Sequence, residues 1–244
     1  MSCPRTGNTG NAFDYNLYYS AAGSAGSLWQ WDDGLITGFT AWKAEIGGDP
    51  HSRFGLPLFK STSTPDLHLQ RSSPAVNAMD PSATTMPGEQ DIDGRPRRTG
   101  TALDLGADEL SAYDAWCVDW FGAQAGNSAI TAPSADPDLD HVKNIEEYLY
   151  ATNPMLASSE RFYIAGVSGS ASSIRFRRSR TALDLVYGIQ WSPNLFDWFD
   201  PDPLHALQES VIQTTPTYDW MQANLTFPPA ESRQFYRMIL DISP

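Results

Sequence analysis

Oxygen-bearing side chains recur at regular intervals between residues 136 and 147. Counted from the first of them, they occupy loop positions 1, 3, 5, 9 and 12, and they are Asp136, Asp138, Asp140, Asn144 and Glu147. This is the ligand spacing of an EF-hand calcium loop, in which alternate side chains turn inward and a last carboxylate contributes both oxygens. The backbone carbonyl of Val142 would supply the ligand at position 7.

Position 6 of this loop departs from the EF-hand pattern. Glycine is usual there because the chain turns with a positive φ, and this sequence has His141 instead. Histidine visits that backbone region more often than most residues, so the loop is weakened but not excluded. The alternative is an acidic, solvated turn before a helix. Because all five side-chain positions carry oxygen donors, the sequence favours calcium.

Two helices would have to position the loop. Aromatic residues at i, i+3 and i+7 predict a helix over residues 112–121, ended by Gly122. We interpret this aromatic stripe as part of a small core rather than as a platform for stacking sugars. A short second helix is expected over residues 144–150, and it must end before Pro154, which cannot continue it.

The C-terminal part of the chain alternates apolar and polar residues with turn residues between the segments. Such regular short strands predict a β-sandwich of immunoglobulin or fibronectin type. The predicted strands are 161–167, 173–177, 185–191, 209–214, 220–227 and 234–240. A basic cluster lies in this part, formed by Arg175, Arg177, Arg178 and Arg180. We expect a solvated strand face there, with contact to an anionic polymer as the alternative.

The N-terminal part shows shorter and less regular β patterns. The predicted strands are 13–19, 27–31, 35–39, 56–59 and 66–69. A short helix is expected over residues 41–46, capped by Thr40 and ended by Gly47.

Several sequences within residues 11–109 are distinctive in combination: FDYNLYY, FTAWKAEIGGDPHSRFGLPLF, DLHLQRSSPAVNA and DIDGRPRRTGTALDLGADE. They resemble the C-terminal end of exported bacterial right-handed parallel β-helix proteins of the pectate-lyase-like kind. The resemblance implies that residues 66–69 and 102–105 are late coil strands and that residues 73–75 form a fixed turn. Because a coil must bury its face against stacked neighbours, it also implies further coils upstream.

Two later segments carry resemblances of their own. YDAWCVDWFG and ADPDLDHVKNIEEYLYATNP are similar to Asp-rich EF-like segments related to dockerin and thrombospondin type 3 repeats. That family has small residues where this chain has Leu139 and His141. The resemblance implies a structural calcium site, and a single unpaired loop should bind with a Kd of about 10⁻⁴–10⁻³ M. YGIQWSPNLFDW and ESRQFYRMIL resemble the β-domain that ends many exported proteins of such bacteria.

Some other residues have side chains of types used in catalysis or metal binding, but their positions in the sequence do not favour either role. Asp49, His51 and Ser52 are too close in sequence for a Ser-His-Asp relay, whose members come from separate segments, so we expect a turn. Asp91 and Asp93 could bind a cation, although a turn salt-bridged to Arg95 or Arg97 is favoured. His68 is expected to face solvent. The sequence therefore predicts no catalytic residues.

Composition limits the partners. A formal net charge of −13 disfavours nucleic acid and anionic membranes, and no apolar run is long enough to span a bilayer. The N-terminus shows no apolar signal-peptide region, whereas the other features favour an extracellular or cell-surface setting. We therefore expect a piece of a larger exported protein, or a truncated reading frame. Cys3 and Cys117 could form a disulfide.

Together these patterns predict a mainly β chain in three parts. Residues 1–110 would be the last coils of a right-handed parallel β-helix, 111–158 a helix–loop–helix calcium linker, and 159–244 an accessory β-sandwich. The expected function is non-catalytic support within a larger chain that binds or acts on extracellular polysaccharide. The alternatives are a polysaccharide lyase or glycosidase of the β-helix class, and a carbohydrate-binding or adhesion module.

Overall fold

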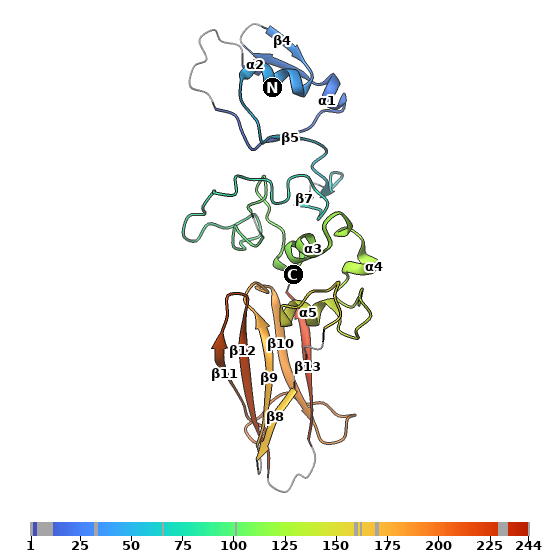
Figure 1. Cartoon of the computed structure of the whole chain (residues 1–244), viewed down its shortest axis with the longest axis vertical. Coiled ribbons are helices and arrows are strands. Elements are labelled where there is room, and N and C mark those ends of the chain that lie inside the picture. The colour runs from blue at the N-terminus through green and yellow to red at the C-terminus, as the bar shows by residue number, and fades with distance from the viewer. Residues whose placement is uncertain are drawn as a thin grey trace. The chain divides into compact units, whose positions relative to one another are not determined.

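The computed structural model describes most of the chain, which divides into two compact units, Met1–Asp119 and Trp120–Pro244 (Figure 1). The described residues are 2–3, 12–31, 34–64, 66–100, 102–158, 161, 163–168, 171–228 and 234–243. Strands account for 31% of the chain and helices for 17%, so the fold is mixed rather than mainly β. None of the described helices combines the length and apolar character that crossing a membrane requires.

The first unit is built from short strands and helices. In chain order they are β1 (Ser2–Cys3), β2 (Leu17–Tyr18), α1 (Gly23–Gly26), β3 (Leu28–Trp31), β4 (Gly34–Thr37), α2 (Phe39–Ile46), β5 (Arg53–Phe54), β6 (Phe59–Ser61), β7 (Asp66–Leu69) and α3 (Ala112–Phe121), whose end crosses into the second unit. β1, β3 and β4 form one sheet, β2 pairs with β5, and β6 pairs with β7.

An aromatic cluster forms the core around α2. Trp29 and Trp42 stack with their ring centroids 5.0 Å apart, and Phe39 packs 5.7 Å from Trp29. α2 ends at Gly47, whose φ of 58° is a left-handed cap, as the sequence predicted. Thr40 is not the N-cap, because α2 begins one residue earlier, after Gly38.

The helix predicted over residues 112–121 is confirmed as α3. Gly122, with a φ of 50°, follows its last residue. Tyr113 and Trp116 are buried and stack at 5.4 Å, whereas Trp120 is 41% exposed, so only part of the aromatic stripe joins a core. Cys117 is fully buried in α3, and the side chain of Cys3 lies outside the described residues, so a disulfide between them stays a prediction.

The segment from residue 71 to residue 111 is held together by side chains rather than by strands. Arg97 donates hydrogen bonds to the carbonyls of Asp104 (3.1 Å), Gly106 (2.5 Å) and Asp108 (3.1 Å). Asp104 in turn accepts from the backbone N–H groups of Asn77 (2.7 Å) and Leu110 (3.0 Å). The prediction of a strand at residues 102–105 is therefore wrong. Backbone groups of this segment bond to the side chains of Arg97 and Asp104 instead of to a neighbouring strand.

No stacked solenoid coils are present in the part of the first unit that the structure describes. Its parallel pairings, β1 with β3 and β2 with β5, are two residues long each, and its other pairings are antiparallel. The predicted fixed turn at residues 73–75 does form, with the N–H of Val76 donating to the carbonyl of Ser73 at 3.1 Å. Apolar side chains are buried against α2 and α3 instead of against neighbouring coils.

The second unit contains all six strands predicted from the alternating pattern. They are β8 (Tyr163–Ser168), β9 (Ala171–Ser179), β10 (Leu185–Ser192), β11 (Leu207–Thr214), β12 (Tyr218–Thr226) and β13 (Phe235–Ile242). Three helical segments precede them, η1 (Gly122–Gln124), α4 (Ser128–Thr131) and α5 (Asn144–Tyr150). Two antiparallel sheets result, one in the order β11-β12-β9-β8 and one of β10 with β13.

These sheets are consistent with a small β-sandwich. On β9 and β12 alternate residues are buried, and the register pairs Phe176 with Met221 and Ile174 with Ala223 across the strands. Ile189 of β10 joins the same core. Because alternate side chains of a strand point to opposite faces, one apolar face of each strand is enough to build this core.

Helix α5 completes the core of the second unit. Val142, just before the helix, and Leu149 and Tyr150 within it are buried together with Ile174 and Phe176. Tyr148 is also buried, and its hydroxyl donates to Asp184 Oδ1 at 2.7 Å. Figure 1 shows α5 at one end of the strands. The acidic loop that precedes α5 is thus attached directly to the sheet core.

Truncating this core should destabilise the second unit strongly. We expect Phe176→Ala to lower the free energy of unfolding by about 3–5 kcal/mol, because Phe176 is fully buried. Phe196→Ala is the matched control, since Phe196 is 88% exposed and its loss should change stability by about 0.5 kcal/mol or less. Urea unfolding followed by tryptophan fluorescence measures both. Equal losses for the two variants would contradict the described core.

Candidate metal centre

The acidic loop turns sharply between α4 and α5. Two of its residues have left-handed backbones, Leu139 with a φ of 62° and His141 with a φ of 70°. The N–H of His141 donates to Asp136 Oδ2 at 2.9 Å, which closes the turn. The expectation that His141 takes the glycine conformation is confirmed, and Leu139 shows that a second position of the turn is left-handed as well.

The three aspartates of the loop converge. Asp136, Asp138 and Asp140 each offer a carboxylate oxygen, and the three atoms lie within 4.8 Å of one another. Backbone donors fix the carboxylates: the N–H of Asp140 bonds to Asp138 Oδ1 at 3.2 Å, and the N–H of Val142 bonds to Asp140 Oδ1 at 2.7 Å. The predicted positions 1, 3 and 5 are therefore brought together.

The predicted ligands at positions 9 and 12 are completely buried. Asn144 donates through Nδ2 to the carbonyls of Ile130 (2.7 Å) and Ala132 (2.9 Å), which leaves its Oδ1 as the unused end of the amide. Glu147 accepts one hydrogen bond, from the hydroxyl of Thr152 to Oε1 at 3.3 Å. Both residues have zero exposed area.

Four buried oxygens of these ligand residues have no hydrogen-bond partner among the described residues. They are Asp136 Oδ1, Asp138 Oδ2, Asn144 Oδ1 and Glu147 Oε2, which stand at loop positions 1, 3, 9 and 12. Buried polar atoms are nearly always paired, so unpaired acceptors at four ligand positions favour a bound partner. The ligand atoms that lie within 4.8 Å of one another are those of the three aspartates, and Glu147 is outside that group. All four unpaired atoms are oxygens of carboxyl groups or of an amide, and this donor set fits a hard divalent cation such as calcium.

The carboxyl groups of the loop are buried and repel one another, which favours a positive charge among them. Burial raises the pKa of Glu147 to about 8, and the nearby charge of Asp138, followed by those of Asp140 and Asp136, raises it further. Burial likewise raises the pKa of Asp138, with added repulsion from Asp140 and Asp136. A cation among these groups would remove the repulsion and hold them as carboxylates.

Asp140 also makes contacts that the sequence did not predict. Its Oδ2 accepts from the backbone N–H of Ser158 at 2.7 Å, and Arg161 donates to its carbonyl at 2.9 Å. Both contacts come from the segment that leads into β8. Asp140 therefore ties the loop to the start of the sheet, whether or not it also contacts an ion. Val142 has a fully buried side chain, so its backbone is anchored at position 7 by the core.

The turn around residues 49–52 forms no catalytic relay. Ser52 bonds to Asp49, whereas His51 pairs through Nδ1 with Asp14 at 2.7 Å and stacks on Tyr15. Asp49 is fully buried and also accepts from Trp42 at 3.3 Å. The histidine and the serine thus belong to different contacts, and the prediction of a structural turn agrees with this geometry.

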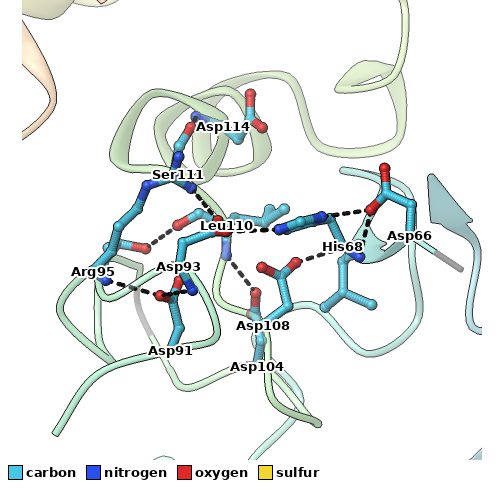
Figure 2. A network of polar contacts seen from close by, with 12 residues as sticks. Asp66, His68, Asp91, Asp93, Arg95, Asp104, Asp108, Leu110, Ser111 and Asp114 are labelled. Carbon is cyan, nitrogen blue, oxygen red and sulfur yellow. Dashed lines mark hydrogen bonds and ion pairs between the residues drawn. The ribbon is translucent and has the colours of Figure 1, made fainter. Parts of the chain in front are cut away.

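His68 is partly exposed to solvent, with 31% of its side chain accessible. Asp93 pairs with Arg95 at 2.9 Å, as predicted, and His68 contacts the same aspartate through Nε2 at 2.9 Å (Figure 2). Its other nitrogen, Nδ1, lies 2.5 Å from Asp66 Oδ1. The segments that meet here are far apart in sequence, so spacing alone could not reveal the contact.

Searches against protein-family models, curated proteins and solved structures found no match to this chain. The assignment of the acidic loop as a cation site therefore rests on its own geometry.

Replacing Glu147 should separate the effect of an ion from the effect of packing. In a chelator we expect Glu147→Gln to leave the melting temperature unchanged or raised, because it removes charge repulsion. In calcium it should abolish most of the stabilisation, which is about 2.7 kcal/mol when calcium exceeds its Kd 100-fold. Differential scanning calorimetry in both buffers measures this.

Glu146→Gln is the matched control for this experiment. Glu146 accepts the N–H of Lys143 at the start of α5, at 2.9 Å, so its loss should be small and the same in both buffers. If Glu147→Gln also shifted the melting temperature equally with calcium and with chelator, the loop would hold no ion.

The left-handed backbone at Leu139 offers a second test. Leu139 is 79% exposed, so Leu139→Gly loses little packing and relieves an unfavourable conformation. We expect the second unit to gain about 0.5–1 kcal/mol in free energy of unfolding. Leu156→Gly, at an exposed residue without positive φ, should instead lose stability. A loss of stability in Leu139→Gly would contradict the described turn.

Proposed function

We propose that the loop at residues 136–147 binds one calcium ion and that the ion stabilises the second unit. The observation that carries this proposal is the set of four unpaired, buried oxygens at the ligand positions. Calcium takes six to eight oxygen ligands. This loop offers the unpaired side-chain oxygens of Asp136, Asp138, Asn144 and Glu147. Asp140 and the backbone carbonyl of Val142 are the two further ligand positions of the loop.

The contacts of α5 explain how binding would act on the fold. Glu147 and Leu149 lie on the same short helix, and Leu149 is packed in the sheet core. Asp140 bonds to Ser158 in the segment before β8. An ion that orders the loop would therefore restrain both the helix and the entry to the sheet. This role is structural, because the free energy of binding adds to the stability of the folded unit.

We propose further that the chain is a non-catalytic accessory region of an exported protein, and that its sandwich is of the immunoglobulin or fibronectin type. The support is the resemblance of its segments to exported β-helix, EF-like and C-terminal β-domain sequences, together with the net charge of −13. Extracellular polysaccharide is the partner that this resemblance implies. The absence of solenoid coils from the described residues means that the β-helix relation rests on residue resemblance alone.

The three tryptophans of the sandwich favour support over sugar binding. A sugar platform needs tryptophan rings with open faces, but Trp191 is buried, and Trp198 and Trp220 are half-buried. Arg237 lies over the ring of Trp198 at 4.5 Å, and Arg177 lies over that of Trp220 at 5.5 Å. These cation–π contacts occupy the surfaces on which a sugar would stack.

The most perturbed carboxylate of the first unit also has a structural explanation. Burial and the charge of Asp104 raise the pKa of Glu109 to about 7. Glu109 is almost fully buried and pairs with Arg97 at 2.9 Å. An acid catalyst must reach its substrate, and Glu109 is enclosed in the network that shapes residues 97–110.

Two measurements test the proposed function. Isothermal titration of the natural chain should give one calcium site with a Kd of about 10⁻⁴–10⁻³ M, the range of extracellular calcium modules. Incubation with pectin, alginate or glycosaminoglycan should give no unsaturated product and no new reducing ends. A titration that showed no heat of calcium binding, or no one-to-one stoichiometry, would contradict the ion site. Sustained release of product from a polysaccharide would contradict the non-catalytic role.

A further inference from the structure

A second group of potential metal ligands lies in the first unit, apart from the acidic loop. His68 belongs to β7, Asp93 to the turn after residue 90, and Asp108 to the segment before α3 (Figure 2). Each offers one ligand atom, and the three atoms lie within 4.8 Å of one another. Three segments separated in sequence therefore present one imidazole and two carboxylates at a single point.

The backbone around this point is fixed without help from the histidine. The N–H of Leu69 donates to Asp108 Oδ2 at 2.6 Å, which attaches β7 to the segment before α3. The N–H of Ile92 donates to the carbonyl of Ala107 at 3.0 Å and attaches the turn to the same segment. The ligand atoms are held in place by these bonds, so the cluster is preorganised.

An unpaired buried oxygen lies on Asp91, two residues before Asp93 in the same turn. Asp91 Oδ2 is buried and has no hydrogen-bond partner among the described residues. Asp108 is nearly completely buried, and its Oδ2 accepts the N–H of Leu69. Buried carboxylate oxygens without donors are costly, and a cation beside them would compensate the charge.

The orientation of His68 suits metal binding. Asp66 Oδ1 lies 2.5 Å from Nδ1 and also accepts the backbone N–H of His68 at 3.1 Å. A carboxylate at Nδ1 holds a proton there, so Nε2 is the nitrogen that can exchange its proton for a metal ion, as in metal-bound histidines. Nε2 is the atom that faces Asp93, at 2.9 Å.

We propose that His68 Nε2, Asp93 and Asp108 form a binding site for a divalent transition-metal ion of the zinc class. An imidazole with two carboxylates is a donor set that zinc accepts and calcium does not favour. Ligand atoms around tetrahedral zinc are about 3.4 Å apart, from bonds of about 2.0–2.2 Å, so Nε2 and the Asp93 oxygen need to separate only slightly. Asp66 is a positioning residue that acts through His68.

The site borders a cavity, which gives it a further property. A cavity of about 480 Å³ is lined by Asp108 and by apolar side chains that include Leu67, Leu69 and Ile92. Three protein ligands leave one position of a tetrahedral ion open, as in catalytic rather than structural zinc sites. The ligand expected at that position is water or a small molecule with an oxygen donor and an apolar body.

The competing explanation is a protonated His68 that bridges Asp66 and Asp93 without any metal. The two explanations differ in what occupies Nε2, a metal ion or a proton. Long-range ¹H–¹⁵N spectra of the natural chain distinguish them directly, because zinc should remove the proton-bound signature of Nε2 while Nδ1 keeps its proton. This measurement needs no variant, so it remains decisive even if a substitution impairs folding.

Metal titration of the full chain tests the proposal. In saturating calcium, to keep the acidic loop occupied, ZnCl₂ should bind with one equivalent per chain, and CoCl₂ should give the visible absorption of tetrahedral cobalt. His68→Asn and Asp93→Asn should abolish the cobalt spectrum. Asp66→Asn should keep the spectrum but weaken zinc binding about 10–100-fold, the usual cost of losing an outer-shell carboxylate.

His51→Asn is the matched control, because His51 also pairs with an aspartate, Asp14, in the same unit. It should leave zinc binding and the cobalt spectrum unchanged, and thermal melts verify that each variant is folded. If zinc failed to bind, or bound equally well to His68→Asn, the proposal would be overturned and His68 would be a protonated link. Zinc binding that is lost in His68→Asn belongs to this site, whereas zinc binding to the acidic loop would persist in that variant, so failure of this proposal is distinguishable from failure of the calcium site.

Discussion

The structure of the second unit depends on carboxyl groups that are buried next to an apolar core. Glu147 has no exposed area, and no Lys, Arg or His of the described residues pairs with it. The helix that carries it also carries Leu149 and Tyr150, which are packed against the sheets. Glu147 cannot move toward water without withdrawing these residues from the core. The cation proposed for the loop would keep Glu147 ionised without disturbing this packing.

The buried carboxyl groups of the two units have different electrostatic surroundings. In the first unit, Arg97 lies within bonding distance of Glu109 and donates to three carbonyls around it, so the positive charge is part of the chain. Burial still raises the pKa of Glu109, to about 7. In the second unit the pKa of Glu147 rises to about 8, where three aspartates add repulsion. The guanidinium is always present in the chain, whereas the ion proposed for the second unit would make stability depend on the ion concentration.

Features encoded by local spacing could be predicted from the sequence. The alternation of residues 171–179 and 218–226 places Ile174, Phe176 and Met221 on one face, and the observed strands follow it. The helix at residues 144–150 and the converging oxygens of the acidic loop are likewise matters of short-range spacing. These predictions succeeded because strand, helix and calcium-loop periods act within about a dozen residues.

Features that depend on contacts between distant segments could not be predicted. The strand that the resemblance implied at residues 102–105 does not form, because Asp104 and Arg97 make bonds that reach backbone groups up to 27 residues away. His68 meets Asp93 across 25 residues and Leu69 meets Asp108 across 39, which no periodicity encodes. Polar side chains that replace backbone pairing look like loop residues in a sequence. In this chain, such residues shape the whole segment before α3, and they bring the imidazole and the two carboxylates together. In this segment, hydrogen bonds from side chains to the backbone replace the bonds between strands. The same contacts therefore determine both the local fold and the positions of the candidate ligands.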